Sequence, residues 1–95
     1  MYGTIGRMKV KPGKIGELIA LMNSDDRKPD GSIVNYVYKL DNSENELMIA
    51  VVFRDKESYF KNADDPAQDE WYRKMVKLLE GPPSWDDGEI VAGGS

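Results

Sequence analysis

The residues that could do chemistry in this chain are aromatic and amide side chains, because the usual catalytic types are missing. The 95 residues include no histidine and no cysteine. Histidine-based triads, the commonest metal ligand, thiol catalysis and disulfides are therefore excluded. The candidates include two close pairs of aromatic residues, Tyr36 with Tyr38 and Trp71 with Tyr72. Together with Asn62, they could supply the walls and hydrogen-bond donors of a site for a small aromatic compound.

Each aromatic pair also has a purely structural interpretation. Trp71 and Tyr72 stand at helical spacing with Met75, which is typical of side chains packed in a core. Tyr36 and Tyr38 share one face of a predicted strand, where aromatic residues are common for packing reasons. Both interpretations stay open at the level of sequence.

Three candidates lie outside these aromatic pairs. Gly6 lies within a predicted strand, and its missing side chain leaves a gap that a ligand or another backbone could approach. Arg7 could supply a positive charge, but strand alternation places it on the opposite face from Gly6, and a surface ion pair is the competing role. Asn62 could donate to an anionic oxygen, or it could cap the backbone where a helix is interrupted.

Composition narrows the partners that we expect. Thirteen basic and seventeen acidic residues give a net charge of −4, and no dense Lys/Arg cluster is present, so we expect no nucleic-acid partner. No apolar run approaches membrane-spanning length and the first residues do not resemble a signal peptide, so we expect a cytoplasmic protein. Paired aspartates occur at 25–26, 64–65 and 86–87, which we interpret as turn and cap residues because no EF-hand spacing is present. We expect neither a metal nor another cofactor.

The run Leu47–Phe53 dominates the pattern of predicted elements. Seven consecutive apolar residues bounded by polar ones predict a strand that is buried on both faces. Around it the periodicity predicts strands at 2–10, 33–40 and 85–91 and an amphipathic helix starting at Pro12. It also predicts a short helix at 56–62 capped by Asp55 and a longer helix capped by Asp65.

This order, β-α-β-β-α(α)-β, fits the ferredoxin-like plan β-α-β-β-α-β, which has one antiparallel sheet and helices on one face. We assign residues 1–91 to a single domain and interpret 92–95 as a flexible tail. The helices can cover only one face of the sheet, and the other face would be an exposed apolar patch. The sequence therefore predicts a homodimer in which two sheets pack face to face around a two-fold axis.

Two stretches resemble the antibiotic-biosynthesis-monooxygenase-like (ABM-like) family. The first is Tyr2–Lys14, which resembles the first strand and helix start of these domains, and the second runs from Ala50 through Tyr59 and Asn62 to Tyr72. The resemblance covers nearly the whole chain. It implies a dimeric α+β barrel with a pocket between helices and sheet in each subunit. By this resemblance, the pocket would be formed by the candidate residues Gly6, Tyr36, Tyr38, Asn62, Trp71 and Tyr72.

The same resemblance implies two alternative functions. One is a cofactor-independent monooxygenase acting on a small phenolic or quinol compound, with no catalytic residue assigned. The other is a non-catalytic dimeric domain that binds or senses a small molecule, and an isomerase on the same fold is a third hypothesis. The haem-degrading branch is set aside, because the positions of its asparagine, tryptophan and axial histidine correspond to Gly6, Asn62 and Tyr72 here.

Overall fold

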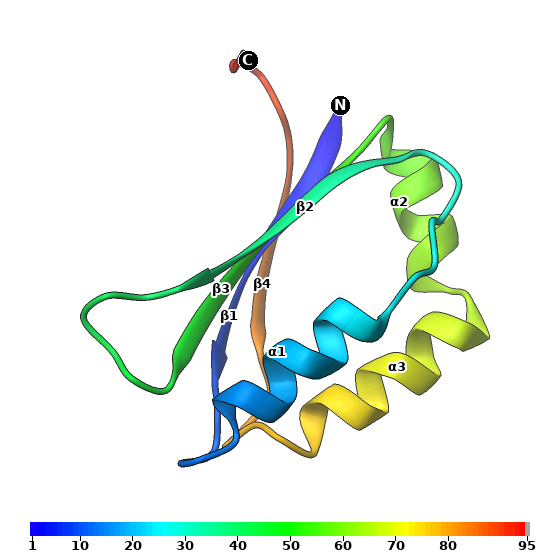
Figure 1. Ribbon diagram of the computed structural model, residues 1–95. Helices are drawn as coiled ribbons and strands as arrows, with labels where there is room; N and C mark the ends of the chain where they lie inside the picture. The colour runs from blue at the N-terminus through cyan, green and yellow to red at the C-terminus, as the bar shows by residue number, and fades with distance from the viewer. Residues whose placement is uncertain (95) are drawn as a thin grey trace.

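The chain folds as the predicted ferredoxin-like α+β domain. The computed structural model describes residues 1–94, so the last residue of the predicted tail lies outside the described part. The elements follow the order β-α-β-β-α-α-β, and Figure 1 shows the helices on one side of the sheet. Their bounds are β1 Tyr2–Lys9, α1 Ile15–Ser24, β2 Ser32–Lys39, β3 Glu46–Phe53, α2 Lys56–Ala63, α3 Pro66–Val76 and β4 Ser84–Glu89.

The four strands form one antiparallel sheet in the order β2-β3-β1-β4. The apolar strand β3 lies between β2 and β1, as its composition predicts, because a central strand of such a sheet has neighbours on both sides. The last strand lies at the edge of the sheet, also as predicted, although it spans Ser84–Glu89 rather than 85–91.

Local capping explains where the helices begin. The side chain of Asp55 accepts a hydrogen bond from the backbone N–H of Ser58 at 2.8 Å, and Asp65 accepts one from Ala67 at 2.9 Å. Both predicted N-caps are thus confirmed. The prediction that Pro12 stands in the first turn of α1 is wrong: the helix begins at Ile15, because Gly13 has a φ of 78°, which no right-handed helix contains.

The pairing register assigns the two faces of β3, which the sequence left open. Met8 pairs with Leu47 and Thr4 with Val51, and these residues face the helices. The same face carries Leu47, Ile49, Val51 and Phe53, and the opposite face carries Met48, Ala50 and Val52, because side chains alternate along a strand. The second face is not covered by any helix of the chain, and we call it the open face.

The helices are held against the sheet at two separate places. At one end lies the buried core, formed by Met8, Val10, Leu18, Leu47, Met75 and Leu79. At the other end, α2 is attached by a cluster of aromatic rings whose centroids lie 5.1–5.9 Å apart: Tyr2, Phe53, Tyr59 and Phe60. Over residues 1–94, no helix has both the length and the apolar character needed to cross a membrane.

Candidate functional site

Between these two attachment places, an open cavity of about 400 Å³ lies between the sheet and the helices. This is within the size range of small-molecule sites. The strands β1, β3 and β4 form one wall, and α2 and the start of α3 form the other. The lining residues are Thr4, Ile49, Val51, Phe53, Tyr59, Phe60, Asn62, Ala63, Gln68, Asp69, Trp71, Tyr72, Trp85 and Asp87.

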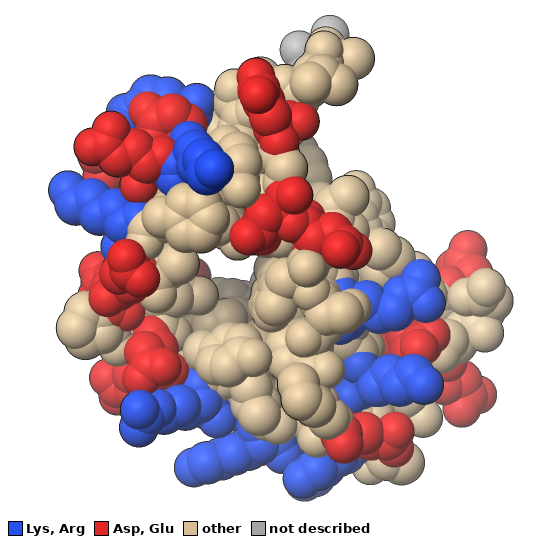
Figure 2. Space-filling view, turned by 180° about the vertical axis from the view of Figure 1, so that it is seen from behind, with Lys and Arg blue, Asp and Glu red and all other residues tan. Residues whose placement is uncertain are grey.

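The cavity opens on the side of the molecule that carries β4. Figure 2 shows a hollow near the centre of this face, with acidic side chains beside it. A smaller cavity of about 160 Å³ adjoins it under the connection between α1 and β2. The two cavities share six of their lining residues and therefore form one passage. The shared residues are Ile49, Val51, Phe53, Asn62, Gln68 and Trp71.

Three of the predicted site residues line this cavity, namely Asn62, Trp71 and Tyr72. Trp71 and Tyr72 are half-buried and pack against the core cluster, which confirms the structural interpretation of this pair, and both residues also line the cavity. The backbone carbonyl of Asn62 accepts a hydrogen bond from the backbone N–H of Asp65 at 3.0 Å, so the helix break is held by a backbone contact that does not involve the Asn62 side chain.

Gly6 faces the helices as predicted, but the gap that it leaves is already filled. A Cβ added at this position would collide with Cζ3 of Trp85, which stands opposite Gly6 in the β1–β4 pair. The prediction of a ligand beside Gly6 is therefore corrected: the glycine accommodates the indole of Trp85, and this ring forms the cavity wall instead.

Tyr36 and Tyr38 are not brought to the cavity. Tyr36 pairs with Ala50 and Tyr38 with Met48, so both rings project from the open face, where they are 59% and 53% exposed. Arg7 lies on this face too, as alternation predicts, and its guanidinium contacts the sulfur of Met48. Strand alternation, rather than distance along the chain, separates these residues from the site.

A polar cluster occupies the β4 side of the cavity. The hydroxyl of Tyr59 donates a hydrogen bond to Oδ1 of Asp87 at 2.9 Å, and Thr4 stands opposite Asp87 in the β1–β4 pair. Within residues 1–94, the buried side-chain polar atoms without a partner are Thr4 Oγ1 and Trp71 Nε1, and both residues line the cavity. Unpaired buried groups reduce stability, and such groups are typical of functional sites.

The lining of the larger cavity carries negative charge and no Lys or Arg. Of its two carboxylates, Asp69 is engaged by Arg73 one helical turn away, at 3.0 Å. Arg27 lines the smaller cavity. It is the only Lys or Arg along the passage among the residues that the structure describes.

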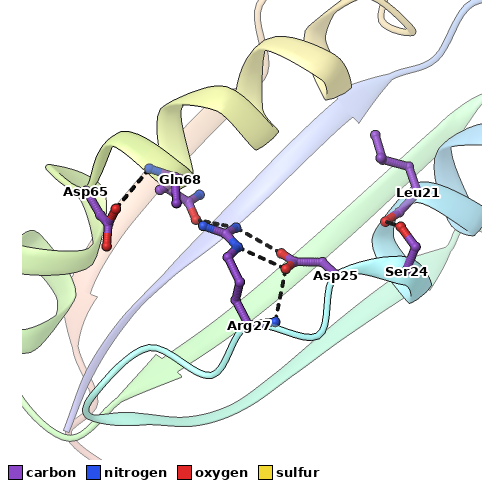
Figure 3. Close-up of polar contacts among 7 residues, drawn as sticks. Leu21, Ser24, Asp25, Arg27, Asp65 and Gln68 are labelled. Atoms are coloured by element: carbon purple, nitrogen blue, oxygen red, sulfur yellow. Dashed lines mark hydrogen bonds and ion pairs between the residues drawn. The ribbon is translucent and has the colours of Figure 1, made fainter.

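Arg27 is already committed to other protein groups. Its guanidinium donates hydrogen bonds to both carboxylate oxygens of Asp25, each at 2.9 Å, and to the side-chain oxygen of Gln68 in α3 at 3.1 Å (Figure 3). This contact lowers the pKa of Asp25 and raises the pKa of Arg27, because each charge stabilises the other. Arg27 therefore fastens the α1–β2 connection to α3.

The cavity lining also contains three residues that were not predicted: Tyr59, Trp85 and Asp87. The aspartates at 86 and 87 were interpreted as turn residues, but both lie within β4, where they face opposite sides of the sheet. Alternation along 84–89 is the signal that could have placed Trp85 and Asp87 on the same face of the strand. This signal is weak because every residue of β4 is exposed. No group of three or more His, Cys, Asp or Glu residues within residues 1–94 could hold a metal ion.

Burial raises the pKa of Tyr59 to about 12, and the hydrogen bond to Asp87 acts in the same direction. We expect a tyrosinate absorbance titration to contain a late step near pH 12 that Tyr59→Phe removes. Because the folded protein holds this proton more tightly than the unfolded chain, the corresponding stability is complete below pH 10 and is lost as the pH rises from 10 to about 12. Loss of amplitude near pH 10 in the variant, with the late step intact, would contradict this assignment.

The same fold is found in solved structures of other proteins. No family model matches the chain, and no curated protein matches it. Solved structures do match. A "putative antibiotic biosynthesis monooxygenase" from Chloroflexus aurantiacus superposes with a TM-score of 0.84 and 21% identity, covering 99% of this chain and 96% of the other.

Two further structures agree. One from Nitrosomonas europaea with the same description gives a TM-score of 0.84 at 10% identity, covering 97% of this chain and 100% of the other. A conserved protein from Methanosarcina mazei gives 0.82 at 19% identity, covering 92% of this chain and 89% of the other. The chain therefore has the ABM-like ferredoxin-type α+β fold that the sequence resemblance predicts.

Proposed function

We propose that this protein is a cofactor-independent monooxygenase that acts on a small phenolic or quinol compound. The observation that carries the proposal is the cavity of about 400 Å³, which is walled by aromatic and aliphatic side chains and carries a polar cluster on its β4 side. The monooxygenase-like fold of the neighbouring structures supports the same reaction class by analogy.

Such a reaction requires little of the protein because the substrate supplies the electrons. Oxidation of an anthrone-type methylene to a carbonyl consumes one O₂ and releases one water, with all the electrons taken from the ring system. The site has to hold a flat ring, accept the hydroxyl proton and limit the access of water. Trp71, Tyr72 and Trp85 supply the aromatic surface for the first of these tasks.

Oxygen uptake tests this activity directly. We expect purified protein to accelerate O₂ consumption with at least one compound from a panel of anthrones and hydroquinones. Val51→Phe should reduce this rate at least about tenfold, because Val51 lines both parts of the passage and the larger ring fills it. The unfolding midpoint of the variant serves as the control for folding.

The panel also decides between the alternatives. Saturable binding without any O₂ consumption would replace the monooxygenase with a non-catalytic binding domain. Conversion of a ligand without O₂ consumption would favour an isomerase. Absence of both binding and turnover across the panel would contradict a site for phenolic compounds.

We also propose that the working unit is a homodimer formed through the open face. Ile5, Tyr36 and Tyr38 are each more than half exposed there, and they surround Ala50 and Met48 of the central strand. An apolar surface of this kind is unusual for a monomer, and a second copy would cover it by isologous packing.

Light scattering at micromolar concentration should therefore give a particle near twice the chain mass of 10.7 kDa. Ala50→Glu should halve that mass, because it places a charge at the centre of the open face. Val91→Glu is the matched control, since Val91 is 89% exposed and lies outside the sheet. A wild-type monomer, or a dimer that survives Ala50→Glu unchanged, would contradict this interface.

A further inference from the structure

The cavity contains one carboxylate that no cation neutralises. Its titratable lining residues are Tyr59, Tyr72, Asp69 and Asp87. Asp69 is paired with Arg73 at 3.0 Å, whereas Asp87 takes part in no ion pair among the described residues. The hydrogen bond that Asp87 receives comes from Tyr59 and involves Oδ1 at 2.9 Å, so Oδ2 is left for a ligand.

Tyr59 acts on Asp87 as a fixed donor. Burial and the neighbouring carboxylate hold the phenol in its protonated form, so its hydroxyl donates to Oδ1. Its ring is in turn fixed among Tyr2, Phe53 and Phe60, with centroid distances of 5.1–5.5 Å to these three rings. Tyr59 thereby orients the carboxylate, and it does not need to contact the ligand itself.

The position of Asp87 also suits an aromatic ligand. Asp87 and Trp85 stand two residues apart on the helix-facing side of β4, opposite Thr4 and Gly6 respectively. Alternate residues of a strand are separated by roughly 7 Å, which is comparable to the length of two fused aromatic rings. A flat ligand packed against the Trp85 indole can therefore present an edge hydroxyl to Asp87.

We propose that Asp87, oriented by Tyr59, accepts the hydroxyl proton of the ligand and selects uncharged hydroxyaromatic compounds over aromatic anions. The catalytic part of this proposal rests on the proposed monooxygenase function. The O–H bond of the ligand breaks with its proton moving to Asp87 Oδ2 and its electron pair staying on the ligand, which then passes one electron to O₂. The ligand radical and superoxide so formed combine through a new C–O bond, the peroxide takes the proton back from Asp87, and loss of one water leaves the carbonyl product. Because a neutral phenol is a weaker acid than a carboxylic acid, the proton transfer is completed as the ring loses its electron to O₂.

The charge pattern gives the selectivity. A ligand carboxylate or phosphate would meet the unpaired charge of Asp87, and the lining of the larger cavity has no Lys or Arg to balance it. A ligand hydroxyl instead donates to a charged acceptor, and hydrogen bonds of this kind are about twice as strong as neutral ones. The same site therefore favours a phenol over its methyl ether, which has no proton to donate.

Calorimetric titration with three probes tests the selectivity: 1-naphthol, 1-methoxynaphthalene and 1-naphthoate. Wild-type protein should bind 1-naphthol at least about tenfold more tightly than either of the other two. Asp87→Ala should abolish the preference for naphthol over its methyl ether and should improve naphthoate binding. Asp86→Ala is the matched control, because it removes the same charge from the opposite face of β4. Equal affinities of the wild type for naphthol and its ether would overturn the proposal.

Turnover separates the role of Asp87 from the proposed function. With a substrate found by O₂ uptake, Asp87→Asn should lower kcat about 100-fold or more, as expected for loss of a proton acceptor. Tyr59→Phe should lower kcat several-fold with little change in KM or in unfolding midpoint, because it affects the carboxylate rather than the walls.

If the wild type consumes no O₂, the monooxygenase fails while the three-probe order still decides the selectivity of Asp87. If the wild type is active and Asp87→Asn keeps more than half of its kcat, the catalytic role of Asp87 is overturned and the monooxygenase stands.

Discussion

The structure depends on how the helices are held against the sheet. They are packed tightly at one end, where Met8, Leu18 and Met75 are fully buried, and attached by aromatic rings at the other. Between these two places Trp71 and Trp85 form walls without closing the space. A cavity costs free energy of folding, because the atoms that line it lack dispersion attraction from neighbours, and this cost grows with the cavity volume. The contacts at the two ends of the helix layer offset this cost.

The two faces of the sheet have separate tasks because β3 is apolar throughout. Leu47 and Phe53 close the ends of the helix-facing side, and Ile49 and Val51 line the cavity between them. Met48, Ala50 and Val52 leave an apolar open face, which the proposed dimer would cover. A single strand thus contributes to the core, to the cavity and to the proposed interface, so its register sets the position of all three.

Periodicity was sufficient to predict the fold, but it was less informative about the site. The run Leu47–Phe53, the caps at Asp55 and Asp65 and the alternation of Tyr2–Val10 each predicted the observed element, because these signals are local. Trp71 and Tyr72 were found because a helical stripe fixes which side chains face inward. Tyr36 and Tyr38 were misplaced because both faces of their strand carry apolar residues, and only the pairing with Ala50 and Met48 separates them from the cavity.

The edge strand supplied what the sequence did not reveal. Trp85 fills the gap at Gly6, which lies about 80 positions away in the sequence. Asp87 accepts a hydrogen bond from Tyr59, which lies 28 positions away. No local pattern specifies such pairs. Asp87 gives the cavity a negatively charged hydrogen-bond acceptor. Arg27 does not neutralise this charge, because its guanidinium is bound to Asp25 and Gln68.

The central claim, a ligand site between the sheet and the helices, is tested most directly by NMR titration of ¹⁵N-labelled protein with 1-naphthol. Trp71 and Trp85 are the two tryptophans of the chain, and both line the cavity. We predict that both indole N–H signals shift saturably, together with amides of β4, while the amides of Met8 and Leu18 in the core stay unchanged. Unchanged indole signals, or shifts confined to the open face around Ala50, would contradict this placement of the ligand site.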